Sequence, residues 1–123
     1  RQVLVPGNFP KDAPPDGMTF DVITMLAVLE HIPSERQAEL AAASYQLLNP
    51  SGRVIVTVPS RRVDDILHLL QSIRLIDGLS VHEHYGFDPT QVSTIFSSPM
   101  FRLVKQTRFQ LGLNNLFVFE RNP

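Results

Sequence analysis

A strand, a helix and a second strand between residues 20 and 60 constrain the fold more than any other part of the chain. The two strands, residues 20–26 and 53–59, are nearly continuous apolar runs, a pattern typical of strands covered on both faces. A helical pattern over residues 34–48 joins them. Strands connected by such a crossover helix pair in parallel with a right-handed connection. The sequence therefore predicts an α/β fold.

The loops that follow the two strands are the predicted ligand site, because parallel sheets bind ligands beyond the carboxyl ends of their strands. These loops are residues 25–33 and 59–62. Ser34 and Gln37 fit a capping box at the start of the helix, and residues 49–52, Asn-Pro-Ser-Gly, predict a turn before the second strand.

The second half of the chain predicts two more helices and a hairpin. Residues 63–76 are amphipathic, and Asp88 followed by Pro89 marks the start of a short helix. Residues 101–110 and 116–121 predict a closing antiparallel β-hairpin. Its second strand is continuously apolar and is expected inside the sheet, while the first strand carries the charges typical of an edge.

Composition excludes several classes of protein. A chain of 123 residues with 43% hydrophobic residues and a net charge of -1 is a single globular domain, residues 1–123, with no basic surplus for nucleic acid. The absence of cysteine excludes disulfides, thiolate metal sites and a cysteine nucleophile. No apolar run reaches the length of about 18 residues that a membrane span needs, and no signal peptide is apparent. A cytoplasmic location is the expectation.

Three polar groups are candidates for chemistry. Glu30 and His31 either hold the turn and the helix entry by hydrogen bonds, or place an imidazole that acts as a base near neutral pH at the mouth of the site. His82 and His84 would point to one side of an extended segment and raise a metal hypothesis, although no third ligand is apparent. Arg61 is either a solvated loop charge or a contact for an anionic substrate.

Three stretches in order resemble the middle and later part of class I S-adenosylmethionine-dependent methyltransferases. They are Phe-Asp-Val-Ile-Thr at residues 20–24, Val-Leu-Glu-His-Ile-Pro at 28–33, and the run from Leu-Leu-Asn-Pro-Ser-Gly at 47–52 to the end of the second strand. The resemblance implies part of a Rossmann-like three-layer sandwich that ends in an antiparallel hairpin. The chain departs from the family in one large respect, because the Gly-rich loop after the family's first strand and the acidic residue ending its second have no counterpart here.

The resemblance also implies the ligands and the site. The cofactor is S-adenosylmethionine, the acceptor is a small molecule, and no metal is needed. The implied cofactor-binding residues are Asn8, Phe9, Met25, Leu26 and Ala27, the implied catalytic residue is His31, and the implied substrate-binding residues are Arg61, His82, His84 and Tyr85.

Three functions stay open at this point. The chain is the C-terminal part of a methyltransferase domain, a non-catalytic α/β interaction module that has lost the cofactor-binding half, or a His/Glu metal hydrolase. Without the Gly-rich loop we expect the chain alone to bind S-adenosylmethionine very weakly and to show no turnover. We also expect two copies of the chain to form a homodimer through the exposed edge of the strand at residues 20–26, unless residues 3–5 cover that edge.

Overall fold

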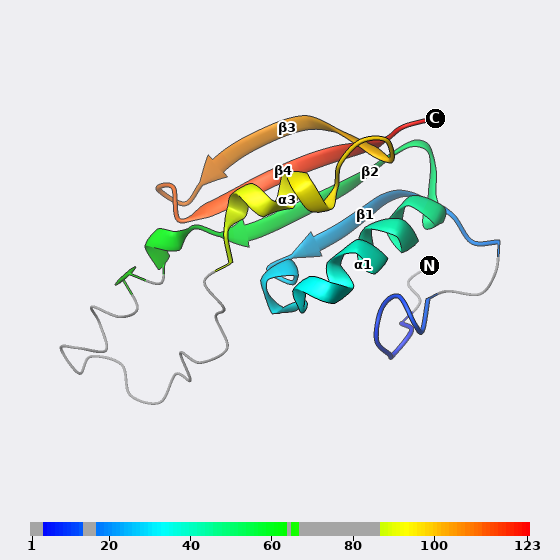
Figure 1. The fold of residues 1–123 in the computed structure, drawn as a ribbon, viewed down its shortest axis with the longest axis horizontal. Coiled ribbons are helices and arrows are strands. Elements are labelled where there is room, and N and C mark those ends of the chain that lie inside the picture. The colour runs from blue at the N-terminus through cyan, green and yellow to red at the C-terminus, as the bar shows by residue number, and fades with distance from the viewer. Residues whose placement is uncertain (1–3, 14–16, 64, 67–86) are drawn as a thin grey trace.

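A computed structural model describes residues 4–13, 17–63, 65–66 and 87–123, and its centre is a mixed β-sheet (Figure 1). The four strands are β1 (Phe20–Leu26), β2 (Leu48–Pro59), β3 (Phe101–Phe109) and β4 (Asn114–Arg121). They lie in the order β1-β2-β4-β3. β1 and β2 are parallel, while β4 is antiparallel to both β2 and β3. The predicted α/β fold, the parallel pair and the closing hairpin are confirmed.

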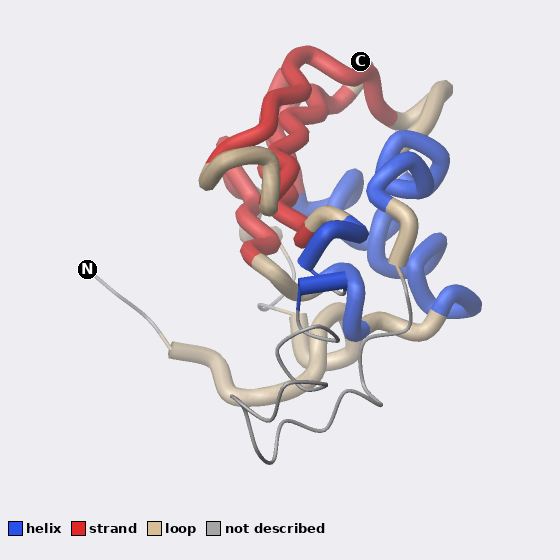
Figure 2. Tube along the Cα trace, turned by 90° about the vertical axis from the view of Figure 1, so that its left-hand side faces the viewer, coloured by secondary structure: helices blue, strands red, loops and turns tan. Residues whose placement is uncertain are grey.

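Apart from the helical residues 61–63 and 65–66 after β2, the described helices lie on one face of this sheet, as two views of the molecule show (Figures 1 and 2). They are η1 (Leu29–His31), α1 (Ser34–Leu47), η3 (Pro89–Gln91) and α3 (Val92–Ile95). α1 makes the crossover from β1 to β2, as predicted. The described residues therefore form two layers, one of helices and one of sheet.

The core lies between these two layers. Val54, Val56 and Val58 of β2 and Phe117 and Phe119 of β4 are each at most 1% exposed. Aromatic rings of α3 and β3 complete the packing: Phe96 stacks on Phe119 with ring centroids 5.3 Å apart and meets Phe101 edge to face at 5.4 Å. Leu40 and Ala41 cover this cluster from α1.

The opposite face of the sheet is open in the described part of the chain, which corrects the expectation of strands covered on both faces. Val22 and Leu26 of β1 are 48% and 60% exposed. Burial in β2 alternates instead of being continuous. The reason is that α1 and α3 cover only one face. The apolar residues on the other face remain accessible to solvent.

Of two local predictions at the ends of α1, the capping box is wrong and the turn is confirmed only in part, because residues 49–52 form an irregular segment inside β2 where the register with β1 shifts. Pro33 is the N-cap of α1, and no side chain caps the helix. Gln37 donates from Nε2 to the carbonyl oxygen of Ile32 at 3.0 Å, so the capping box with Ser34 does not form. At the other end, β2 begins at Leu48, before the predicted turn, and Ser51 takes a φ of 61° within it.

Other local predictions are confirmed or lie outside the described residues. Asp88 caps η3, because its Oδ1 accepts from the backbone N–H of Thr90 at 3.0 Å. Of the helix predicted at residues 63–76, residues 63 and 65–66 are helical and the remainder lies outside the described residues. Over the ranges that the structure describes, no helix is long and apolar enough to cross a membrane.

Candidate functional site

The loop after β1 lies at the carboxyl ends of the parallel strands, which is the place predicted for the ligand site. β1 and β2 are parallel, so their carboxyl ends at Leu26 and Pro59 lie at one edge of the sheet. The backbone N–H of Ala27 donates to both the carbonyl oxygen and Oγ1 of Thr57, each at 3.1 Å. Ala27 has a φ of 53°, so the chain turns as it leaves β1. This turn leads directly into η1, beside the carboxyl end of β1 (Figure 1).

η1 holds one buried and one exposed ionisable side chain. Leu29 is fully buried and anchors η1 to the core. Glu30 is only 6% exposed, while His31 is exposed. In the part of the chain that the structure describes, Oε2 of Glu30 is buried without a hydrogen-bond partner. Burying a carboxylate without a partner is costly, so such a group points to a ligand or a functional site.

A cavity of about 490 Å³ adjoins Glu30. Its lining combines η1 and the start of α1 with Phe87 and Gln91, which precede α3. A cavity of this size fits a small molecule. Among the described residues its lining is mostly polar, with Ile32, Pro33 and Phe87 as the apolar members. The cavity therefore lies where the sheet topology places ligands, and Glu30 is one of its lining residues.

An ion pair fixes the segment that carries Phe87 and Gln91. Nη2 of Arg61, which follows β2, lies 2.5 Å from Oδ2 of Asp88. The backbone N–H and the side chain of Thr90, with the Arg61 guanidinium, hold the pKa of Asp88 below its usual range. Arg61, predicted to bind substrate, is thus paired with a carboxylate of this chain at a position next to the cavity lining.

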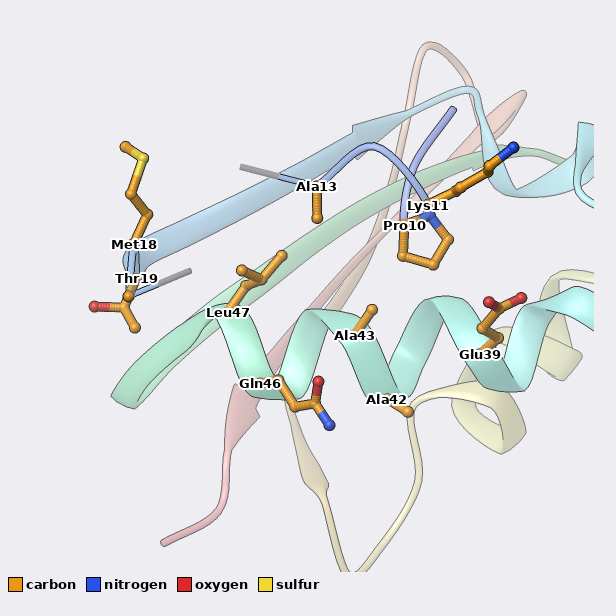
Figure 3. Close-up of a pocket in the computed structure, with 11 residues that line it drawn as sticks. Pro10, Lys11, Ala13, Met18, Thr19, Glu39, Ala42, Ala43, Gln46 and Leu47 are labelled. Atoms are coloured by element: carbon orange, nitrogen blue, oxygen red, sulfur yellow. The ribbon is translucent and has the colours of Figure 1, made fainter. Parts of the chain in front are cut away.

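The predicted cofactor residues near the N-terminus, Asn8 and Phe9, line neither this cavity nor the second one described below. Asn8 forms a turn in which its N–H donates to Oδ2 of Asp12 at 2.8 Å, and Phe9 packs partly buried against the core. The residues that follow lie beside α1 and line a second cavity of about 580 Å³ together with Glu39 and Leu47 (Figure 3). This second cavity shares no lining residue with the first.

The remaining predicted residues divide into three groups. Met25 is 6% exposed and belongs to the core, so its side chain does not face a ligand site. Leu26 and Ala27 are exposed at the end of β1. His82, His84 and Tyr85, and with them the metal hypothesis, lie outside the described residues. Among the residues that are described, no three His, Asp or Glu side chains are grouped to hold a metal ion.

The sequence analysis named Glu30 but did not place it in the site. It also did not place Phe87 or Gln91 there. One signal was available, because Glu30 is a charged residue that directly follows the apolar pair Val28 and Leu29. Phe87 and Gln91 gave no such signal, since their proximity to Glu30 depends on the path of the chain between β2 and α3.

The fold defines a class of protein, namely an α/β protein with a candidate ligand site at the carboxyl ends of its parallel strands. Within that class, the chain belongs to the methyltransferase domain family, whose sequence profile matches residues 1–104. This confirms the resemblance seen in the sequence. No curated protein sequence matches the chain significantly.

Solved methyltransferase structures share the fold at low sequence identity. The N-methyltransferase NodS from Bradyrhizobium japonicum WM9 is 13% identical with a TM-score of 0.57, and the alignment covers 90% of this chain and 56% of that one. The magnesium protoporphyrin IX methyltransferase ChlM from Synechocystis PCC 6803, solved with bound SAH, is 19% identical with a TM-score of 0.57 and coverages of 86% and 47%. The chain thus spans about half the length of these structures.

Proposed function

We propose that this chain forms the acceptor-side part of an S-adenosylmethionine-dependent methyltransferase that acts on a small molecule. The observation that carries the proposal is the position of the cavity beside Glu30, directly after β1, in a chain of the methyltransferase family. When bound, S-adenosylmethionine supplies a methyl group activated by its sulfonium sulfur.

The residues of this chain fit one part of that cofactor. Leu26 and Val28 are 60% and 41% exposed at the carboxyl end of β1, and they offer an apolar surface for the adenine ring. The backbone of Ala27 adjoins them. The sequence contains no Gly-rich loop to cradle the carboxylate end of the cofactor through backbone N–H groups. The chain therefore provides the adenine and methyl side of the site only.

The chemistry assigned to the chain is positioning and proton removal. Methyl transfer depends mainly on holding the acceptor atom in line with the methyl group and on excluding water. The cavity holds the acceptor. His31, exposed in η1 next to Glu30, is assigned the role of base for an acceptor that must lose a proton.

The test is a titration of the 123-residue chain with S-adenosylhomocysteine, followed by NMR at millimolar ligand. We expect weak binding that shifts backbone amide signals of residues 26–31, and no turnover with the chain alone. Leu26→Arg should abolish these shifts because a charged side chain would occupy the adenine surface. Leu111→Arg is the matched control, since Leu111 is 97% exposed in the hairpin turn between β3 and β4. Unchanged binding by Leu26→Arg, or no shift at these residues in the unmodified chain, would contradict the proposal.

A further inference from the structure

The turn between β3 and β4 presents apolar side chains to solvent at one end of the sheet (Figure 1). Leu111 is 97% exposed, more than any other large apolar residue that the structure describes. Phe109, the last residue of β3, is 38% exposed. We call Phe109 and Leu111 the hairpin tip. A single exposed leucine is ordinary on a protein surface, so the surroundings of the tip decide whether it has a partner.

The backbone of the turn holds Leu111 in this exposed position. Gln110 and Leu111 have φ values of 50° and 57°, and Gly112 has a φ of 83°. Residues other than glycine adopt such angles infrequently. The N–H of Gly112 donates to the carbonyl oxygen of Phe109 at 3.1 Å. The N–H of Leu113 donates to that of Gln110 at 3.0 Å. The turn is thus fixed in an unfavourable conformation, and such conformations recur at binding sites.

The hairpin that carries the tip has a surplus of positive charge. Residues 101–113 contain Arg102, Lys105 and Arg108 and no acidic residue, whereas the whole chain has a net charge of -1. Arg102 pairs with Glu120. Lys105 and Arg108 are exposed, and neither forms an ion pair with another residue of the described ranges. Two uncompensated cations therefore lie on the strand that leads into the tip.

The segment after β2 lies beside the tip and adds little net charge. The N–H of Ser60 donates to the carbonyl oxygen of Leu113 at 2.8 Å, which joins this segment to the turn. Arg61 pairs with Asp88, while Arg62 and Asp65 are both exposed. The positive charge at this end of the molecule therefore comes mainly from the hairpin.

We infer that the hairpin tip docks on the surface of an anionic lipid bilayer. Apolar side chains enter the boundary between headgroups and acyl chains, and neighbouring cations meet anionic headgroups. The tip combines both features, with Leu111 in the turn and Arg108 next to Phe109. A nucleic acid would offer negative charge but no apolar phase for a leucine side chain, so a bilayer matches the tip better.

This docking is independent of the proposed function and needs no spanning helix. It would also orient the candidate site. Pro59, at the carboxyl end of β2, pairs with Asn114 at the start of β4, so the turn lies at the same edge of the sheet as the loop after β1. A bilayer in contact with the tip would lie along this edge. Substitution of Leu111 acts on the bilayer contact only, so cofactor binding measured without lipid should not change.

A fluorescent reporter tests whether the tip enters the bilayer. The chain contains no tryptophan, so Leu111→Trp introduces a single indole. The protein is titrated with vesicles of phosphatidylcholine and phosphatidylglycerol in equal parts. We expect the emission to shift to shorter wavelength, because indole rings settle at the membrane–water interface. Leu4→Trp is the matched control, since Leu4 is 89% exposed outside the hairpin. No shift in Leu111→Trp, or an equal shift in Leu4→Trp, would overturn the inference.

Vesicle sedimentation separates the apolar contribution from the charged one. Leu111→Asn removes the apolar side chain, and asparagine tolerates a positive φ. We expect it to weaken partitioning by at least about tenfold. Arg108→Gln should weaken partitioning by about fivefold at low salt and by less at high salt. Arg36→Gln is the matched control and should have no effect, since Arg36 is an exposed cation on α1.

The remaining outcomes would contradict the inference. Equal partitioning of the unmodified chain and of Leu111→Asn would show that the tip makes no contact with the bilayer. Equal binding to vesicles of pure phosphatidylcholine would show that the cations have no part in it. A single-stranded DNA oligonucleotide is titrated in parallel. Binding of this DNA that Arg108→Gln weakens, with no shift of the Leu111→Trp emission by vesicles, would identify the partner as a nucleic acid.

Discussion

The two faces of the sheet differ in what covers them, although the same strands form both. On the face toward α1 and α3, Val54, Val56, Val58, Phe117 and Phe119 are at most 1% exposed. On the opposite face, Val22 and Leu26 are about half exposed or more, and Val118 is half-buried. Side chains alternate between the faces along each strand, so neighbouring residues of one strand experience different surroundings.

This difference shows which face of the sheet contributes most of the stability and which face is accessible to other molecules. Burial of apolar side chains is the main favourable contribution to folding, and here it is concentrated on the covered face. The open face instead holds an ion-pair group in which Glu120 of β4 meets Arg53 at 3.1 Å and Arg102 at 2.5 Å. Substitutions of sequence neighbours should therefore separate the two faces.

Among truncations of side chains, the largest expected effect is that of Phe119→Ala on the covered face. Phe119 is fully buried and stacks on Phe96 and Phe117. Removing a buried phenylalanine ring lowers the free energy of unfolding by about 3–5 kcal/mol. Val118→Ala, the adjacent residue on the open face, should cost about 1 kcal/mol, because less buried surface is lost. Urea denaturation measures both, and equal losses would show that the open face is covered in solution.

A smaller loss is expected for Tyr45→Leu at the edge of the covered face. The Tyr45 ring meets Phe101 edge to face at 5.8 Å, and the Cζ atom of Arg121 lies 4.4 Å from its centroid. An aromatic pair and a cation–π contact together contribute about 1–2 kcal/mol. Tyr45→Phe keeps both contacts and should lose less, since the hydroxyl makes only a long 3.4 Å bond to the carbonyl oxygen of Asn122. Thermal unfolding of both variants checks this order of stability. The expectation would be contradicted if Tyr45→Phe lowered the stability as much as Tyr45→Leu.

Much of the covered layer could be predicted because it depends on local patterns. The apolar runs predict the strands, the helical spacing predicts α1, and Asp88 with Pro89 predicts a capped helix start. The wrong capping box at Ser34 has a local cause, because Pro33 already takes the N-cap position and Gln37 bonds to Ile32. Periodicity identified the strands correctly but could not show which face would be covered.

The candidate site was predicted less completely than the fold. The sheet topology predicts its place, and Leu26 and Ala27 lie there. The environment of Glu30 could not be read from the sequence, since a turn carboxylate that bonds to the backbone and one that lacks a partner have the same sequence pattern. Phe87 joins the cavity only through tertiary folding. The roles of His31 and of the cofactor residues stay predictions.

Glu120 makes the stability contributed by the open face dependent on pH. Hydrogen bonds from Arg102 and Arg53 hold the pKa of Glu120 below its usual range. Its contribution to stability is therefore fully present above the ordinary carboxyl pKa and is lost as the pH falls through the lower pKa of the folded state. Glu120→Gln should flatten the acid side of the stability profile, and added salt should do so partially because both arginines are exposed. Phe119→Ala should leave that slope unchanged, and a similar flattening in Phe119→Ala would contradict the assignment to Glu120.

The smallest expected effect on stability is that of Leu26→Arg, the variant proposed to abolish cofactor binding. Leu26 is 60% exposed at the end of β1, and a substitution at such a position changes the free energy of unfolding by about 0.5 kcal/mol or less. Met25→Arg, one residue earlier, should unfold the chain, because Met25 is 6% exposed and an unpaired charge would enter the core. Circular dichroism with urea denaturation compares the two. If Leu26→Arg destabilised the chain as Met25→Arg does, the open face at β1 would be part of a packed core, and loss of ligand binding in that variant would report unfolding instead of a blocked adenine surface.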